Sequence, residues 1–114
     1  MQRPFRLRYS ADFTRLRAAG HTWRSPWLTL SIAPNGLPHN RYGFVIGKRV
    51  GGAVVRNRVR RQMRSVLSQI NQQLRPGYDM VWIARNEIAG QAYTEISAAV
   101  YELVRRARLL KSDE

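Results

Sequence analysis

Two segments in the first half of the chain alternate between apolar and polar positions, residues 27–33 and residues 41–47. Their apolar positions are Leu28, Leu30, Ile32, Tyr42, Phe44 and Ile46. In the first segment, the opposite side carries Trp27, Thr29 and Ser31. A period of two residues is typical of half-buried strands. Since a Pro- and Gly-containing turn at residues 34–38 separates them, we predict an antiparallel hairpin.

Residues 54–74 follow a different period, with apolar side chains every three or four positions. These are Val55, Val59, Met63, Val66, Ile70 and Leu74. The pattern predicts one long amphipathic helix. Its opposite side carries Arg58, Arg60, Arg61 and Arg64, with Arg56 at the border. Proline and glycine at positions 76 and 77 follow the helix, as is common after a helix ends.

Weaker signals complete the element order. Ser10 and Gly20 would bound a short first helix that carries Asp12, Phe13 and Leu16. Residues 79–84 are almost entirely apolar, which is typical of a central strand. Thr94 would cap a last helix, whose core-facing side chains would be Ile96, Val100, Leu103, Val104 and Ala107. This mixture of elements predicts a single α+β domain over residues 1–114.

The net charge of the chain indicates which class of partner it binds. Twenty basic and seven acidic residues give a formal net charge of +13, and there is no cysteine among the 114 residues. No acidic residue lies between Asp12 and Asp79, so the many arginines of this segment have no carboxylate near them in sequence. We therefore expect a polyanionic partner, because arginine suits bidentate phosphate contacts. With neither a signal peptide nor a long apolar run, a cytoplasmic location is expected.

The segment that leads into the long helix is rich in glycine and arginine. Residues 47–61 read GKRVGGAVVRNRVRR. Glycines let a backbone approach a ligand closely, and a helix N-terminus attracts anions. The spacing does not fit the GxxxxGK(S/T) nucleotide-binding loop, because Arg49 stands where the magnesium-binding hydroxyl should be. The residues thus indicate an RNA or DNA contact rather than a mononucleotide site.

This segment resembles the protein subunit of bacterial ribonuclease P, whose hallmark is an Arg-Asn-Arg element in such a context. Asp12 and Phe13 followed by Gly20, and residues 78–85 (YDMVWIAR), are similar to further parts of that family. The resemblance implies the order α-β-β-β-α-β-α with a mixed four-stranded sheet. It therefore implies an additional short strand near Trp23 and a left-handed βαβ crossover, against the usual hand.

The resemblance also implies a function. The family assists a catalytic RNA that removes the 5′ leader of precursor tRNA. The catalytic site and the Mg²⁺ ions would belong to that RNA, with no catalytic residue, metal site or organic cofactor in the protein. The expected partners are the catalytic RNA and the precursor tRNA leader, without a membrane or an obligatory protein partner.

Carried over by position, the resemblance assigns roles to three groups of residues. Those expected to contact the catalytic RNA are Arg56, Asn57, Arg58, Arg60, Arg61 and Arg64. Those in a loop close to RNA and substrate are Lys48, Arg49, Gly51 and Gly52. Those of the leader-binding cleft are Phe13, Arg17, Trp27 and Ser31.

Three positions depart from the family pattern. Gly52 replaces the usual Asn, Arg17 replaces a second aromatic residue, and Ser31 replaces a tyrosine. Trp27 or Trp23 would then supply a substitute ring. Two other functions remain open: a structural RNA-binding protein, such as a ribosomal or assembly protein, and a cationic amphipathic protein that acts on anionic membranes.

Because Arg17 replaces an aromatic ring, leader binding should depend on charge more than on stacking. We expect leader affinity to fall more steeply with salt for this protein than for its Arg17→Ala variant. Titrations of a single-stranded leader at several salt concentrations measure both slopes. Equal slopes would contradict the prediction.

Overall fold

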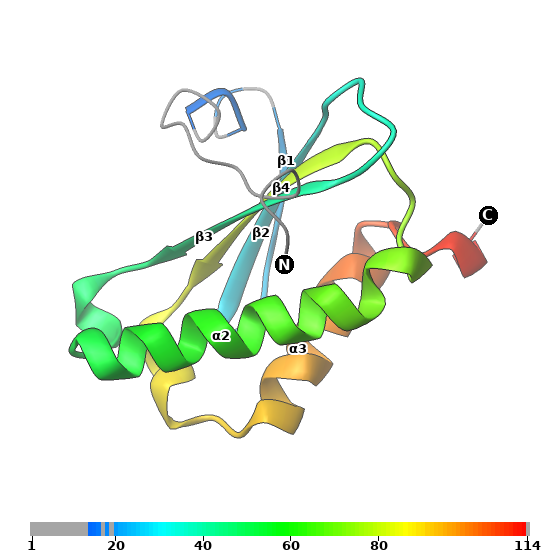
Figure 1. Ribbon diagram of the computed structural model, residues 1–114. Coiled ribbons are helices and arrows are strands. Elements are labelled where there is room, and N and C mark those ends of the chain that lie inside the picture. Colours follow the sequence, from blue (N-terminus) through cyan, green and yellow to red (C-terminus); the bar gives the residue numbers. More distant parts are fainter. Residues whose placement is uncertain (1–13, 17, 19, 114) are drawn as a thin grey trace.

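The computed structural model describes residues 14–16, 18 and 20–113 (Figure 1). Residues 14–16 and 18 are helical. The strands and longer helices that follow are β1 (His21–Arg24), β2 (Leu28–Pro34), β3 (Arg41–Ile46), α2 (Ala53–Ile70), β4 (Tyr78–Ala84) and α3 (Tyr93–Arg106). Short 3-10 helices are η2 (Lys48–Val50), η3 (Asn71–Gln73), η4 (Asn86–Gly90) and η5 (Lys111–Asp113). The predicted α-β-β-β-α-β-α order is confirmed, including the strand near Trp23.

The sheet has the order β1-β2-β4-β3, so the predicted hairpin between the second and third strands is wrong. Instead β4 lies between β2 and β3, antiparallel to the former and parallel to the latter. Since β4 is apolar on both faces, it is favoured in a central position with a partner on each edge. The loop of residues 35–40 is long enough to pass the ~10 Å width of one intervening strand.

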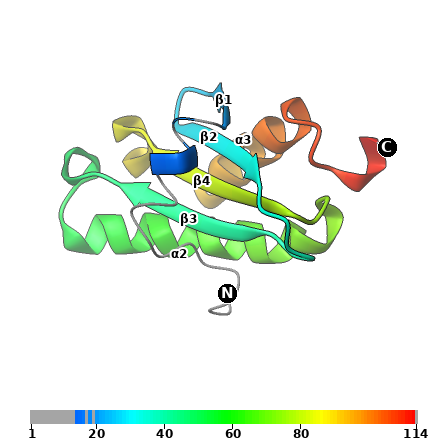
Figure 2. The ribbon, with the colours of Figure 1, turned by 90° about the horizontal axis from the view of Figure 1, so that it is seen from above.

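The crossover from β3 through α2 to β4 is left-handed. Figure 2 looks onto the sheet with α2 and α3 behind it. When the parallel strands β3 and β4 are turned to point upward in that view, β4 lies to the right of β3. A helix behind the sheet then gives a left-handed crossover, as the family resemblance implies.

The main core lies between the sheet and the two long helices. Alternate strand residues, among them Leu30, Tyr42 and Trp82, are at most 1% exposed and face α2 and α3. The predicted apolar stripe of α2 is confirmed and includes Leu67 as well. Both long helices therefore pack on the same face of the sheet, below it in Figure 1.

The other strand positions form a second face, which we call the open face. On the described elements it consists of Thr22, Arg24, Thr29, Ser31, Ala33, Arg41, Gly43, Val45, Asp79, Val81 and Ile83. Leu16 of the first helical segment packs on Ala33 and Val81. Val45 and Ile83 are only half-buried beside them. The first helical segment thus lies over one part of the open face (Figure 2), and the half-buried Val45 and Ile83 lie beside it.

The ends of the long helices differ from two expectations. The α2 helix ends at Ile70 and tightens into η3, so Leu74 lies beyond both helices but stays buried. The α3 helix begins after Ala92, whose side chain makes no capping hydrogen bond. Thr94 is therefore inside the helix and its predicted role as a cap is wrong.

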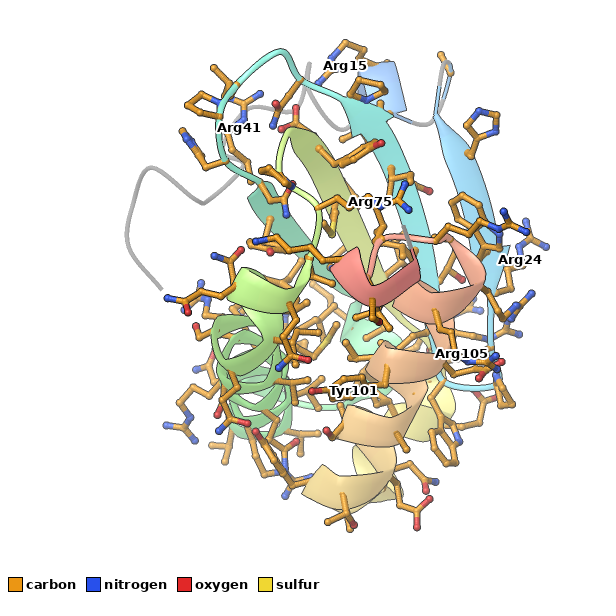
Figure 3. All side chains as sticks on the ribbon, turned by 90° about the vertical axis from the view of Figure 1, so that its right-hand side faces the viewer. Arg15, Arg24, Arg41, Arg75, Tyr101 and Arg105 are labelled. Carbon is orange, nitrogen blue, oxygen red and sulfur yellow. The ribbon has the colours of Figure 1, made fainter. Side chains whose placement is uncertain are left out.

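The buried carboxylate of Asp79 connects three separate segments at the start of β4. Arg41 of β3 donates from Nε to Oδ1 at 2.8 Å and from Nη2 to Oδ2 at 2.7 Å. Arg15 of the first helical segment donates to Oδ2, and Asn35 donates to Oδ1 at 3.0 Å. Figure 3 shows Arg15 and Arg41 together at this end of the molecule. Arg15 and Arg41 therefore do have a carboxylate partner, contrary to the expectation from sequence distance.

These contacts determine how Asp79 titrates. Burial alone would raise the pKa of Asp79, but hydrogen bonds from Arg41 and Asn35 and the charges of Arg41 and Arg15 outweigh it. The net effect is a pKa below the ordinary value. Asp79 consequently stabilises the fold above the unfolded-state pKa of about 3.9, and this stabilisation is lost as the pH falls toward the lower folded-state pKa.

Gly20 permits the close connection between the first helical segment and β1. A Cβ at this position would lie 2.5 Å from the carbonyl oxygens of both Leu16 and Ile32. The Gly20 N–H also donates to Leu16 at 2.9 Å. No side chain fits there unless the backbone moves.

Asp79→Asn should lower the free energy of unfolding at pH 7 by about 1–3 kcal/mol. This is less than the ~3–5 kcal/mol of a fully buried pair, because both guanidinium groups reach water. Urea unfolding from pH 7 to pH 3 should show the difference from wild type closing below about pH 4. The control is Glu102→Gln at an exposed ion pair, expected to change stability by less than ~0.5 kcal/mol. A pH-independent difference would contradict the assignment.

Gly20→Ala should lower the free energy of unfolding by about 1–3 kcal/mol, since the added methyl group overlaps two carbonyl oxygens. Thermal unfolding followed by circular dichroism measures the loss as a lower Tm. Gly90→Ala is the matched control, because a Cβ at Gly90 meets no atom within 4 Å. Equal melting temperatures for the two variants would show that the close approach has no energetic consequence.

Candidate nucleic-acid interface

The loop that leads into α2 is held tightly on its inner side. Val50 is buried, and a Cβ at Gly51 would lie 2.8 Å from Cβ and Cγ1 of Val55. Gly52 is the N-cap of α2, makes no side-chain cap, and has open space around it. The Asn that the family resemblance implies at this position could cap the helix without a clash, whereas Gly52 supplies no capping side chain. The first turn of α2 has no acidic residue, so its positive dipole end stays uncompensated by side chains.

Arg56, Arg60 and Arg64 form a row along the side of α2 that faces β3; we call it the α2 row. Their spacing of four residues places them on neighbouring turns. The Arg64 guanidinium lies over the Phe44 ring of β3, 6.0 Å from the ring centroid. Arg60 Nη1 donates to Oδ1 of Asn57 at 3.1 Å. These contacts orient two of the three guanidinium groups in advance of any ligand.

Arg58 points away from the α2 row. Two positions along a helix differ by about 200° around its axis, so Arg58 projects nearly opposite to Arg56. Its Nη2 donates to the carbonyl of Ala89 in η4 at 2.9 Å. Asn57 and Arg61 are exposed on the outer surface between the two sides. The Arg-Asn-Arg element therefore spreads positive charge around the helix and does not concentrate it in one place.

Within the described ranges, no ion pair reaches Arg56, Arg58, Arg60 or Arg61. The Nε atom of Arg56 is buried without a hydrogen-bond partner. Lys48 and Arg49 of η2 are both exposed just before the helix. This surface is therefore cationic with little internal compensation, which is the electrostatic character of a phosphate-binding face.

The described residues contain no candidate metal-binding site that could serve as an active site. Among them, no group of three or more His, Asp or Glu side chains is placed to hold a metal ion. In the same part of the chain, no helix is long and apolar enough to cross a membrane.

The residues predicted for the leader cleft are only partly brought together. Phe13 and Arg17 lie outside the described residues. Ser31 lies on the open face, 4% exposed, with its hydroxyl 3.0 Å from that of Thr22. Trp27 and Trp23 both pack against the core on the helix side, so neither supplies a ring to the open face. The predicted orientation of Trp27 is wrong because it precedes β2 at a bend, outside the strand alternation.

Other open-face residues were missed by the sequence reasoning. Arg24 of β1 is exposed and is paired in register with Thr29, which is paired in turn with Ile83, and Ile83 is paired with Val45; both of these apolar side chains are half-buried. The alternation of β3 and β4 already puts Val45 and Ile83 on the side opposite the core. Only the strand order, which the sequence did not reveal, makes them neighbours.

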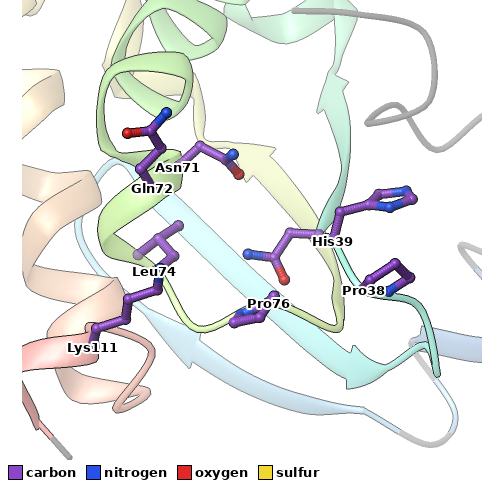
Figure 4. A pocket seen from close by; sticks show the side chains of 8 residues that line it. Pro38, His39, Asn71, Gln72, Leu74, Pro76 and Lys111 are labelled. Carbon is purple, nitrogen blue, oxygen red and sulfur yellow. The ribbon is translucent and has the colours of Figure 1, made fainter.

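A polar hollow of about 420 Å³ lies at the C-terminal end of α2, away from the residues that precede that helix (Figure 4). It is lined by Pro38, His39, Asn40, Asn71, Gln72, Leu74, Pro76 and Lys111. Two of its polar side chains, Asn40 and Asn71, make hydrogen bonds within the fold. Asn40 donates to the Arg75 carbonyl and accepts from the Tyr78 N–H. Asn71 accepts from the Tyr42 hydroxyl, and burial raises the pKa of Tyr42 to about 12.

Comparison with known proteins agrees with this geometry. The sequence pattern of the Ribonuclease P family matches residues 1–108. The ribonuclease P protein component of Roseiflexus castenholzii is 42% identical over 112 residues, which cover 97% of this chain and 92% of that protein. That of Chloroflexus aurantiacus is 42% identical over 111 residues, covering 96% and 82%.

Solved structures share the fold. The RNase P protein of Staphylococcus aureus superposes with a TM-score of 0.88 at 23% identity, covering 94% of this chain and 98% of that one. The RNase P protein of Thermotoga maritima gives 0.82 at 23% identity, covering 89% and 96%. With a family match over nearly its whole length and relatives above 40% identity, this chain belongs to the ribonuclease P protein component family.

Proposed function

We propose that this protein is the protein subunit of ribonuclease P, which binds a catalytic RNA and the single-stranded 5′ leader of precursor tRNA. In this role it assists the Mg²⁺-dependent endonucleolytic removal of the leader. The observation that carries the proposal is that Arg56, Arg58, Arg60 and Arg61 of α2 have no ion pair among the described residues and lie beside a glycine-rich loop.

The arginines of α2 are suited to bind the catalytic RNA. Each guanidinium that meets a phosphate releases condensed counterions, so binding should weaken steeply with salt. The stacking of Arg64 on Phe44 and the Arg60–Asn57 hydrogen bond reduce the freedom that these side chains lose on binding. Asn57 can donate and accept, so it suits a ribose or a base edge as well as a phosphate.

The open face is suited to bind the leader. Val45 and Ile83 offer half-exposed apolar surface for unstacked bases and sugars, and Arg24 lies at the β1 edge of the same face. Such a surface binds single strands with little sequence preference. The rigid sheet would hold the leader in one direction relative to the catalytic RNA on α2.

The hydrolytic chemistry belongs to the RNA in this proposal. Mg²⁺ held by the catalytic RNA would activate the attacking water and stabilise the leaving oxygen. The protein contributes orientation and charge neutralisation, both of which matter most when Mg²⁺ is scarce.

The direct experiment measures leader cleavage of a precursor tRNA by a bacterial ribonuclease P RNA at low Mg²⁺, with and without this protein. We expect cleavage to depend on the wild-type protein. Arg56→Ala combined with Arg58→Ala should lower RNA affinity at least about tenfold and reduce the salt slope by about two, one for each lost phosphate contact.

Ser68→Ala combined with Gln69→Ala provides the control, because both residues are exposed on the same helix and carry no charge. Circular dichroism confirms that both double variants fold. If the wild-type protein binds the RNA tightly yet does not stimulate cleavage, a purely structural RNA-binding role is the better account.

A further inference from the structure

A second group of arginines lies at the opposite edge of the sheet. It consists of Arg24 of β1 and of Arg105, Arg106 and Arg108 at the C-terminal end of α3, all exposed. We call it the β1–α3 patch. Figure 3 shows Arg24 and Arg105 on the same side of the molecule, from two elements far apart in sequence. None of these residues belongs to the Arg-Asn-Arg segment.

Ion pairs within the protein neutralise only part of the positive charge of the β1–α3 patch. Arg106 Nη1 donates to the backbone carbonyl of Arg24 at 2.7 Å and so ties α3 to β1. Arg105 pairs with Glu102 at 2.7 Å, an exposed contact between neighbouring helical turns. Among the described residues, no carboxylate pairs with Arg24, Arg106 or Arg108. Such clustering is unfavourable through self-repulsion unless an anion binds.

The backbone of Arg108 adopts a conformation that is unfavourable for most residues other than glycine. Its φ is 57°, the left-handed region that glycine normally occupies after a helix. The backbone completes the helix end without any help from the side chain: Leu109 N–H donates to the Val104 carbonyl at 2.9 Å. The guanidinium has no hydrogen-bond or ion-pair partner among the described residues. The fold would be better served by glycine here, so the arginine side chain points to a role outside the fold.

Tyr101 extends the patch along α3. It lies four residues before Arg105, so these two side chains are neighbours on the surface of α3, and Arg108 follows just beyond the end of the helix. Its ring is 37% exposed, one of the few large apolar side chains at the described surface to be so. Arginines next to an exposed ring are suited to phosphates with an adjacent unstacked base.

The patch and the α2 row face different directions. The α2 row lies along β3 and the patch lies along β1, which are the two outer strands of the sheet. These strands are about 14 Å apart, and their outward side chains increase the separation. The nucleotides that lie along α2 are therefore not the ones that would contact the patch.

We propose that the β1–α3 patch is a second RNA-binding surface, which takes the phosphodiester backbone of an RNA segment other than the one on α2, with Tyr101 stacking on a base. The inference rests on the proposed function, since it gives the same complex a second point of contact. The segment belongs either to the catalytic RNA or to the precursor tRNA.

Arg105→Gln combined with Arg108→Gly tests the proposal. The glycine removes backbone strain, so the variant should melt at the same or a higher temperature than wild type. Its affinity for the RNA that uses the patch should nevertheless fall about threefold to tenfold, with a salt slope reduced by one to two. Binding is measured separately with the catalytic RNA alone and with precursor tRNA alone, which identifies the source.

Two single variants control for net charge. Glu102→Gln and Glu95→Gln each raise it by one, but only Glu102 pairs with a patch arginine. Tighter RNA binding by Glu102→Gln than by Glu95→Gln supports the patch. Wild-type affinity and salt slope of the double variant for both RNAs would overturn this inference alone. The proposed function fails separately, if the wild-type protein does not stimulate leader cleavage.

Discussion

The buried Asp79 carboxylate is the interaction on which the layout of the sheet depends. It binds Arg15, Arg41 and Asn35, and so holds the first helical segment, the start of β3 and the loop before β3 at one end of β4. This fixes where the first helix covers the open face and where apolar surface remains. It also uses the one buried carboxylate of the described chain, and Arg56, Arg58, Arg60 and Arg61 of α2 have no ion pair among the described residues.

The amphipathic character of α2 then converts a folding requirement into a binding surface. The apolar stripe of α2, from Val59 to Ile70, is buried in the core, so the polar positions of the helix face outward. Because many of those positions are arginines, the fold places mutually repulsive charges around a rigid helix. Packing of the core stabilises this arrangement, and an RNA backbone would relieve the repulsion. Stability and function are therefore coupled through one helix.

Periodicity predicted most elements, because a half-buried strand and an amphipathic helix each leave a direct imprint on the sequence. It did not predict the strand order: the pairing of β4 between β2 and β3 depends on long-range contacts, and the apparent hairpin was wrong. The Asp79 cluster was missed for the same reason, although an acid at the start of an apolar strand was a usable signal. Trp27 was misplaced because it precedes the strand. The roles of Arg56 to Arg64 came from resemblance and charge, and their division between two sides of α2 needed the structure.

The central claim is that the outer side of α2 lies against the catalytic RNA. The chain contains no cysteine, so a single Val54→Cys variant can carry an iron chelate that cleaves nearby RNA; Val54 is 80% exposed at the start of α2. The account predicts localised cuts in the catalytic RNA within an assembled complex that still removes the leader. An active complex without any cuts from this position would show that the RNA binds another face.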